Sequence, residues 1–455
     1  MQARFKYSSV AVFCFSLSLL AGYPAIVRAQ VPPAPLVEKG KPPVDWWFVF
    51  KFNAKSFPGC ASGAERACPF DAPGRTPQDY GKQGHTDQPG FSQQFVTASS
   101  DNKSLRIGQT CIGDSTGDAV GATFDQVYNG SYNYVVWNEQ FYLDPKLPCV
   151  GSYGYCESPY GHSKGMLVWD DNGDGFVMQV STPNWPGAGS KNKPRQTNGN
   201  SLGCITSTES GQLKPQNNVM VSQHFFAVRL TKDDVVIVLK ALHTANVATA
   251  RDPAPGSQSQ LVKNGGPADI QDLVNKLGRI SDDRTILKKT LSSGVQIIAK
   301  PAVLHVPPWH MVSALLGQEP LVVATWWTNP DKIEDTAAMT PGCWAPSLGS
   351  AGSVRNAETG KWTNKTFGLI GAAGFDRNHA KLGVSKMGDF AIFGDFNNQG
   401  RLSEPCGKEQ NTRGGLFYVV ENRTLANELR DLMDSRAPRN NNRGRNDGGR
   451  RVVHR

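Results

Sequence analysis

Two short segments of the sequence each place a histidine and a lysine two residues apart. His162 and Lys164 stand in GHSKG, and His379 and Lys381 stand in NHAKLG in the second half of the chain. Alternate residues of a β-strand point to the same face, so each pair would set an imidazole beside an ammonium. An imidazole can attack phosphorus or carry a proton, and an ammonium can bind a phosphate oxygen. The two pairs therefore indicate chemistry on a phosphate ester.

The surroundings of the two pairs also repeat. After the first pair come a strand-like run, the polar turn DDNGDG, a second strand-like run and then Asn184. After the second pair come a shorter segment, the turn SKMGD, the run FAIF and then Asn397. A lone histidine before a strand is more often a satisfied surface or core residue. Two copies in matched contexts instead favour an internal duplication with a functional role.

This set of side chains predicts a phosphate site that needs no metal and no cofactor. One neutral histidine would attack phosphorus and form phosphohistidine, and the other, protonated, would give its proton to the leaving oxygen. The lysines and the downstream asparagines would stabilise the charge on the non-bridging oxygens. A metal nuclease would instead need clustered carboxylates to hold hard cations.

Strand-like runs that alternate with a few helical segments predict a mixed body, α/β in class with α+β character. About 400 residues of this kind form one large unit or two similar halves. Most of 54–110 is rich in Gly, Ser, Asp and Gln and is expected to form loops. Strands are expected at 43–53, 132–141, 166–169, 176–180, 224–230, 234–239, 296–298, 321–327, 390–393 and 416–420. Helices are expected at 268–277, 309–316 and 424–433.

The two ends of the chain differ in composition from the body. Residues 1–29 have a basic start, an apolar run too short to span a membrane and a small-residue cleavage pattern, which predicts a secretory signal rather than an uncleaved anchor. A Pro-rich lead-in, 30–43, follows. The tail 436–455 is Arg-rich, has few apolar residues and is expected to be disordered. No later apolar run is long enough to span a membrane, so the mature protein is expected to be exported and soluble.

The formal net charge of +9 lies almost entirely at these ends. The predicted signal carries +3 and the tail +6, so the body between them is close to neutral. Charge alone therefore gives no prediction of nucleic-acid binding by the body. The arginines of the tail could add DNA affinity that falls steeply with salt.

Cysteine usage agrees with export. Cys14 leaves with the signal, and an even number in an exported chain predicts disulfides. A zinc site is disfavoured, because neither CxxC nor HExxH is present. Many pairings are open, and Cys60/Cys68 and Cys149/Cys156 are the pairs closest in sequence. The eight that remain are Cys60, Cys68, Cys111, Cys149, Cys156, Cys204, Cys343 and Cys406.

The sequence resembles the deoxyribonuclease II family of the phospholipase D superfamily. The resemblance rests on PVDWWFVFKFN, YVVWNEQF, GHSKGMLVWDDNGDGFVMQVSTPNWP, LVVATWW, NHAKLGVS, GDFNNQG and RGGLFYVVEN, which follow the family order over about residues 43–421. It implies a pseudo-twofold body, each half being a mixed β-sheet flanked by helices. The halves would be 44–250 and 251–435, with one HxK pair from each half in a shared cleft.

The resemblance also implies metal-independent endonucleolytic cleavage of DNA at acid pH, leaving 3′-phosphate ends. His162, Lys164, His379 and Lys381 match the catalytic positions of the family. Asn184 and Asn397 match the downstream asparagines and would bind phosphate. Analogy with the superfamily favours His162 as the nucleophile.

The wider superfamily has an aspartate seven residues after each of these histidines. Here Trp169 and Lys386 occupy those positions, which weakens a phospholipase reading and leaves open what orients each imidazole. Trp137, Asn138 and Gln140 could face the cleft or belong to the core.

Two further patterns are given no catalytic role. The sequence DDNGDG resembles a calcium loop, but Ser181 stands where that loop needs a bidentate carboxylate, so a hairpin turn is expected. His224, His243, His305 and His310 have apolar surroundings and no repeated partner, and they are expected to be structural.

The expected substrate is DNA, with a secreted or periplasmic location, or a lysosomal one if the source is eukaryotic. After signal removal no membrane association is expected, and a homodimer is allowed but not required. Two alternatives stay open. The first is a phosphodiesterase for RNA or phospholipid. The second is a non-catalytic secreted protein that holds DNA through its Arg-rich tail.

Overall fold

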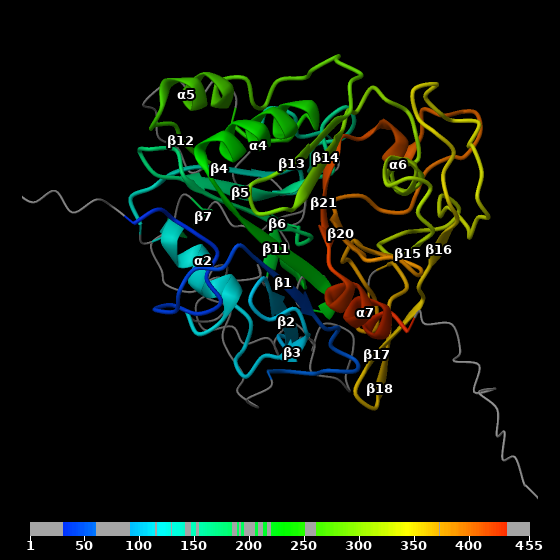
Figure 1. Cartoon of the computed structure of the whole chain (residues 1–455), viewed down its shortest axis with the longest axis horizontal. Coiled ribbons are helices and arrows are strands. Elements are labelled where there is room, and N and C mark those ends of the chain that lie inside the picture. The colour runs from blue at the N-terminus through cyan, green and yellow to red at the C-terminus, as the bar shows by residue number, and fades with distance from the viewer. Residues whose placement is uncertain are drawn as a thin grey trace, which may run out of the picture. The chain divides into compact units, whose positions relative to one another are not determined.

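A computed structural model describes most of the chain between residues 31 and 434 (Figure 1). The chain divides into two units, 1–31 and 32–455, and every element below belongs to the second unit. The predicted signal, the predicted tail, Asn184, Cys68 and Cys204 all lie outside the described residues. The described residues are 31–60, 92–113, 116–128, 130–141, 147–151, 154–183, 189–190, 193–194, 205–207, 213–215, 220–250, 261–372 and 374–434.

The first large sheet has eight strands in the order β12-β4-β5-β6-β11-β1-β2-β3. Each neighbouring pair in it is antiparallel. The strands are β1 (Trp46–Lys51), β2 (Phe95–Ser99), β3 (Arg106–Ile107), β4 (Asn133–Asn138), β5 (Lys164–Trp169), β6 (Gly175–Val180), β11 (Gln223–Leu230) and β12 (Val262–Lys263).

The second large sheet has seven strands in the order β13-β14-β21-β20-β19-β15-β16. It is a mixed sheet, because β15 and β16 are parallel whereas the other neighbouring strands are antiparallel. The strands are β13 (Leu287–Thr290), β14 (Gln296–Lys300), β15 (Leu321–Ala324), β16 (Val354–Asn356), β19 (Leu382–Ser385), β20 (Phe390–Gly394) and β21 (Gly415–Glu421).

The centres of the two sheets have the same strand order. In the first sheet it is β4-β5-β6-β11-β1, and in the second the corresponding order is β15-β19-β20-β21-β14. The chain visits the strands of each half in a matching way, so the HxK pairs stand at the equivalent strands β5 and β19. This is the mixed α+β, two-half architecture that the resemblance to the phospholipase D superfamily implied.

One of the two apolar core clusters among the described residues contains side chains of both sheets. All six residues of β1, WWFVFK, are buried, as a strand covered on both faces requires. Phe393 of β20 stacks on Phe48 of β1 at 4.6 Å and on Phe226 of β11 at 4.3 Å between ring centroids. Aromatic burial of this kind dominates core energetics, so these rings hold the two halves together.

Helices flank the sheets (Figure 1). Helix α4 packs against β6 and β11 of the first sheet and against β13, β14 and β21 of the second. Helix α7 packs against β19 and β20. The three helices predicted from the sequence correspond to α5, α6 and α7. The bounds are α2 (Ala119–Tyr128), α4 (Lys232–Thr244), α5 (Ala268–Val274), α6 (Pro308–Leu315), α7 (Arg423–Leu432) and the 3₁₀ turn η1 (Glu409–Thr412).

Three short two-stranded sheets complete the described elements. They pair β7 with β8, β9 with β10 and β17 with β18. The bounds are β7 (Gly189–Ser190), β8 (Lys193–Pro194), β9 (Ile205–Ser207), β10 (Leu213–Pro215), β17 (Thr359–Trp362) and β18 (Lys365–Gly368).

The strand predicted at 234–239 is wrong, because this segment is the middle of α4. Its β-branched residues suggested a strand. However, Thr231 and Asp234 form a capping box, in which each side chain accepts the other's backbone N–H. Val235, Val238, Leu239 and Leu242 are buried at helical spacing, and this periodicity outweighs β-propensity.

Several described elements were not predicted, including β19, β2 and α2. Strand β2 lies in the segment expected to be loops, and it pairs with β1 in the first sheet. Helix α2 begins after Asp118, whose carboxylate accepts the N–H of Gly121. The glycine in its first turn hid this helix from sequence reasoning, because glycine disfavours helix interiors.

The described residues contain three disulfides, Cys60–Cys111, Cys149–Cys156 and Cys343–Cys406. Of the two pairs closest in sequence, Cys149 and Cys156 form a disulfide, whereas Cys60 is bonded to Cys111 and not to Cys68. Gln93 explains the pairing of Cys60 with Cys111. Its N–H donates to Gly59 O and its carbonyl accepts the N–H of Ile112, so it brings together the segments that carry Cys60 and Cys111.

Within the described part of the chain, no helix has the length and apolar character needed to cross a membrane.

Candidate active site

Each HxK pair lies at the start of an antiparallel hairpin in its sheet. Lys164 is the first residue of β5, which pairs with β6, and Lys381 directly precedes β19, which pairs with β20. Asp170 closes the turn between β5 and β6, because its carboxylate accepts the backbone N–H groups of Asn172 and Gly173. The segment is the hairpin turn predicted from the sequence.

The backbones of the two halves bond to each other at the two histidines. The N–H of His162 donates to Gly414 O, and the N–H of His379 donates to Ser222 O, each over 2.8 Å. Gly414 directly precedes β21, and Ser222 directly precedes β11. Each histidine backbone is therefore held by the start of the matching strand in the other half.

The imidazoles are held in the same reciprocal way. Nδ1 of His162 lies 2.7 Å from the carbonyl oxygen of Asp395, directly after β20. Nδ1 of His379 lies 2.7 Å from the carbonyl oxygen of Ser181, directly after β6. A carbonyl oxygen only accepts, so both Nδ1 atoms carry a proton. Each neutral imidazole then has its lone pair on Nε2, which is left for chemistry.

Glu139 belongs to this site, although sequence reasoning passed over it. Its carboxylate Oε1 accepts a hydrogen bond from Lys164 Nζ at 2.6 Å and lies 3.6 Å from His162 Nε2. The register of the sheet explains this position, since Asn138 at the end of β4 pairs with Lys164. In the sequence, the one signal for Glu139 is that a carboxylate directly follows an apolar strand.

The second pair has different neighbours. Lys381 Nζ donates to His379 O at 2.6 Å and lies 3.1 Å from His379 Nδ1. Since that nitrogen already carries a proton, the second contact places an ammonium against an N–H group. The ring of Trp326 meets the ring of His379 edge-on, with centroids 5.0 Å apart.

The four side chains of the two pairs are almost fully buried, with exposed fractions between 1% and 9%. Burial is the largest cause that lowers the pKa of both His162 and His379, and the ammoniums of Lys164 and Lys381 lower both further. Burial also lowers the pKa of both lysines. Glu139 opposes the shift of Lys164. Because charges of one pair act on the histidine of the other, the two pairs form one electrostatic site.

The carboxyl group of Asp395 is buried and bonds to residues of both sheets. Its carboxylate accepts the amide of Gln179 at 2.9 Å and the N–H of Leu416 at 2.7 Å. Burial raises the pKa of this carboxyl to about 7. Gln179 also approaches His224, whose Nδ1 accepts the N–H of Lys381 at 3.1 Å. His224, expected only to be structural, therefore lies in direct contact with the second pair.

The Cys149–Cys156 disulfide loop supports the first pair. The N–H of Cys156 donates to the backbone carbonyl of Glu139. Arg413 is buried and donates from Nη2 to the carbonyls of Cys156 and Gly161. These contacts bring an additional positive charge next to His162, whose pKa Arg413 also lowers.

The two asparagines expected to bind phosphate are Asn184 and Asn397. Asn184 lies outside the described residues. Asn397 is 5% exposed and lies two residues after Asp395, and its Nδ2 donates to Gln399 at 3.0 Å. Its Oδ1 has no hydrogen-bond partner among the described residues. Within those residues, no group of three or more His, Cys, Asp or Glu side chains could hold a metal ion.

A comparison with known protein families shows which family the chain belongs to. Residues 76–439 match the family Deoxyribonuclease II, over most of the chain. The chain belongs to the deoxyribonuclease II family. It is accordingly a phosphodiester hydrolase of the deoxyribonuclease type, an acid endonuclease of DNA within the phospholipase D superfamily. No curated protein matches the sequence closely enough to add to this.

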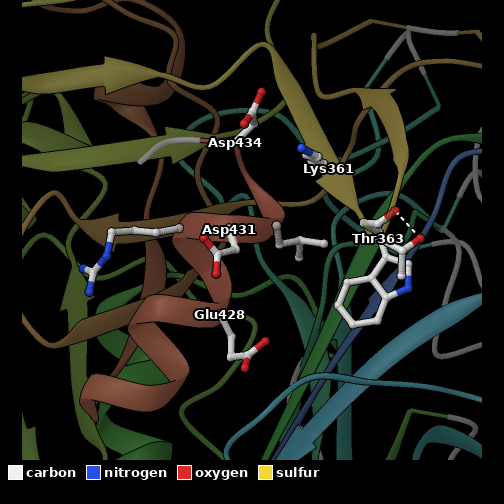
Figure 2. A pocket seen from close by; sticks show the side chains of 8 residues that line it. Lys361, Thr363, Glu428, Asp431 and Asp434 are labelled. Atoms are coloured by element: carbon white, nitrogen blue, oxygen red, sulfur yellow. Dashed lines mark hydrogen bonds between the residues drawn. The ribbon is translucent and has the colours of Figure 1, made fainter. Parts of the chain in front are cut away.

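A different pocket in this deoxyribonuclease II family member is poorly suited to DNA. The pocket, about 390 Å³, lies between α7 and the β17–β18 hairpin. Figure 2 shows the carboxylates of Glu428, Asp431 and Asp434 around it, with Lys361 on the hairpin side. Carboxylates repel phosphodiesters, so this pocket does not compete with the HxK site as the place where DNA would react.

Proposed function

We propose that the chain is an exported, metal-independent acid endonuclease that cleaves DNA through a phosphohistidine intermediate and leaves 3′-phosphate ends. One observation carries this proposal. Each imidazole is fixed by an Nδ1–H bond to a carbonyl of the other half, which leaves both Nε2 atoms for the reaction. Two fixed Nε2 atoms within one buried cationic site suit a nucleophile and a proton donor.

The reaction on this proposal has two steps. One neutral histidine attacks the phosphorus, and the other, protonated, gives its proton to the leaving 5′ oxygen. Water then releases the 3′-phosphate, with the second histidine accepting a proton from the water. Lys164 and Lys381 stabilise the charge on the non-bridging oxygens, and Asn184 and Asn397 bind the same phosphate. His162, Lys164, His379 and Lys381 are the proposed catalytic residues.

The proposed pH dependence follows from the direction of the pKa shifts. One histidine must be neutral and one protonated, so the rate has a bell-shaped pH profile. Burial and the lysines lower the pKa of both His162 and His379. The whole bell is therefore displaced to the acid side of pH ~6.5, where a free histidine titrates.

The proposed location is secreted or periplasmic, or lysosomal in a eukaryotic source. The three disulfides support it, because disulfides persist in oxidising compartments. The predicted signal at 1–29 would direct this export. Both HxK pairs come from one chain, so a homodimer is compatible with the proposed site but not needed for it.

Plasmid nicking in excess EDTA at about pH 5 tests the proposal. Wild type should cut, and His162→Ala and His379→Ala should each lose at least about 1,000-fold, since either change removes a group that the reaction needs. His305→Ala is the matched control, because His305 is exposed and outside the site. RNA and phospholipid vesicles serve as competing substrates. Loss of cutting in EDTA, or near-normal cutting by both site variants, would contradict the proposal.

A further inference from the structure

The two HxK pairs are related by the pseudo-twofold repeat, yet their surroundings are not equivalent. We propose that His379 is the nucleophile that becomes covalently bonded to phosphorus, and that His162 is the general acid that protonates the leaving oxygen. This assignment rests on the proposed function and gives each histidine of that site one fixed role. It reverses the expectation from superfamily analogy, which favours His162 as the nucleophile.

The first observation is a carboxylate that faces only one of the two histidines. At the end of β4, Asn138 pairs with Lys164, and Glu139 follows it. At the end of the equivalent strand β15, Ala324 pairs with Leu382, so Trp326 occupies the position that matches Glu139. The repeat therefore places an anion 3.6 Å from His162 Nε2 and an indole ring against His379.

The second observation is that, within the described part of the chain, only one of the two lysines has a carboxylate partner. Glu139 neutralises Lys164 at 2.6 Å. Lys381 has no ion pair among the described residues, and its Nζ lies 3.1 Å from His379 Nδ1. A proton added at His379 would thus put an imidazolium beside an ammonium that no described carboxylate contacts, although Glu139 and Asp395 act on that ammonium from farther away. A proton added at His162 would instead gain an ion pair with Glu139.

Other charged and titratable groups act on both rings and have to be weighed against this difference. Lys164 and Lys381 act on both histidines, and His224 acts on His379. Arg413 also lowers the pKa of His162 and so opposes Glu139 in part. Among the described residues, Glu139 is the carboxylate within ion-pair distance of either ring. We therefore assign the single proton required by the reaction to His162, because only its Nε2 has this direct contact with a described carboxylate.

The resulting steps balance in atoms and electrons. The Nε2 lone pair of His379 forms the nitrogen–phosphorus bond while the bond from phosphorus to the 5′ oxygen breaks. The electron pair of that bond stays on the 5′ oxygen, which takes the Nε2 proton of His162. Water then loses a proton to neutral His162, its oxygen bonds to phosphorus, and the nitrogen–phosphorus electron pair returns to His379.

Trapping the intermediate in the unaltered enzyme is the first test. A DNA oligonucleotide is mixed with wild type, the reaction is quenched in alkali, where phosphohistidine survives, and tryptic peptides are examined by mass spectrometry. Trypsin cleaves after Arg377 and Lys381, so His379 lies in peptide 378–381 and His162 in peptide 147–164. We expect the nucleotide on 378–381. A nucleotide on 147–164 overturns the role assignment but leaves the proposed function intact, whereas no adduct on either peptide overturns both.

An activated substrate separates the two roles in variants. Thymidine 3′-(4-nitrophenyl phosphate) releases 4-nitrophenolate, which leaves without being protonated. His162→Ala should release one equivalent of nitrophenolate per enzyme and then stall, because no base activates water. His379→Ala should give no burst. A burst from His379→Ala, or none from a folded His162→Ala, overturns the assignment.

Glu139→Gln tests the positioning role of the carboxylate. Without the counter-charge, His162 loses its proton more easily, so the basic limb of the pH profile on DNA should move about one unit lower. The nitrophenolate burst should be unchanged, since it does not use that proton. Glu157→Gln is the matched control, because Glu157 is an exposed carboxylate in the neighbouring loop. A uniform loss of rate with no movement of the limb would show that Glu139 has only a structural role.

Discussion

Replacing Asp395 with Asn tests whether this buried carboxyl is protonated in the folded enzyme at acid pH. Asp395 is 3% exposed, and burial raises its pKa to about 7. In the unfolded chain an aspartate titrates near pH ~3.9. Between these values the folded state binds a proton that the unfolded state does not bind. Asp395 therefore stabilises the fold as the pH falls, and this contribution is lost as the pH rises through about 7.

The size of the effect follows from the width of the pH window. One pKa unit corresponds to about 1.4 kcal/mol, and the carboxyl is already half protonated at pH 7, so lowering the pH from 7 to 5 adds about 2 kcal/mol from Asp395. The buried histidines act in the opposite direction. Burial lowers the pKa of His162, His224 and His379, so their contribution to stability is lost as the pH falls below ~6.5. Wild type and Asp395→Asn both contain these three histidines, so the difference between the two proteins removes their effect.

Urea unfolding of wild type and Asp395→Asn at about pH 5 and pH 8 measures the contribution. The free energy of unfolding of wild type minus that of the variant should be about 2–3 kcal/mol larger at pH 5 than at pH 8. A constant offset from the altered hydrogen bonds cancels in this comparison. Asp45→Asn, which changes an exposed carboxylate, is the control. An equal difference at both pH values, or a larger one at pH 8, would refute the reasoning.

Two further predictions concern the stability of the body. Phe393→Ala removes the ring that stacks between two aromatic residues of the first sheet, so the free energy of unfolding in urea should fall by about 3–5 kcal/mol. Phe393→Leu is the control that keeps most of the volume and should cost less. Replacing Cys343 and Cys406 together with Ser opens a loop of 63 residues, which should cost about 4 kcal/mol on the chain-entropy model. A thermal unfolding midpoint unchanged from wild type would contradict this second estimate.

The sequence by itself determined the local elements and the reactive pairs. Most strands that carry the site were predicted because aromatic and β-branched residues favour buried strands, and these agree with the structure within a few residues, whereas β19 after the second pair was not predicted. The two HxK pairs stood out because spacing and context repeat along one chain. The acidic turn after β5 was equally local, since the carboxylate of Asp170 bonds to N–H groups only two and three residues away.

Errors arose where a segment's structure depends on contacts far along the chain or on competing local signals. The apolar run of α4 suits either a strand or a helix, and the capping box with burial along one face decided for the helix. Cys60 pairs with Cys111 because both flank the segment at Gln93, which no spacing rule shows. Two cysteines that are close in sequence need not form a disulfide, because the folded backbone determines which cysteines come within bonding distance.

The asymmetry of the site was decided only by the tertiary structure. The sequence presents two similar pairs, and nothing in their spacing separates one histidine from the other. The sheet register brings Glu139 to His162, whereas the equivalent register in the second half brings Trp326 to His379. The carbonyls that hold both Nδ1 atoms come from strand ends about 200 residues away in sequence. Side-chain types are local information, but the electric field at each imidazole depends on neighbours that only folding assembles.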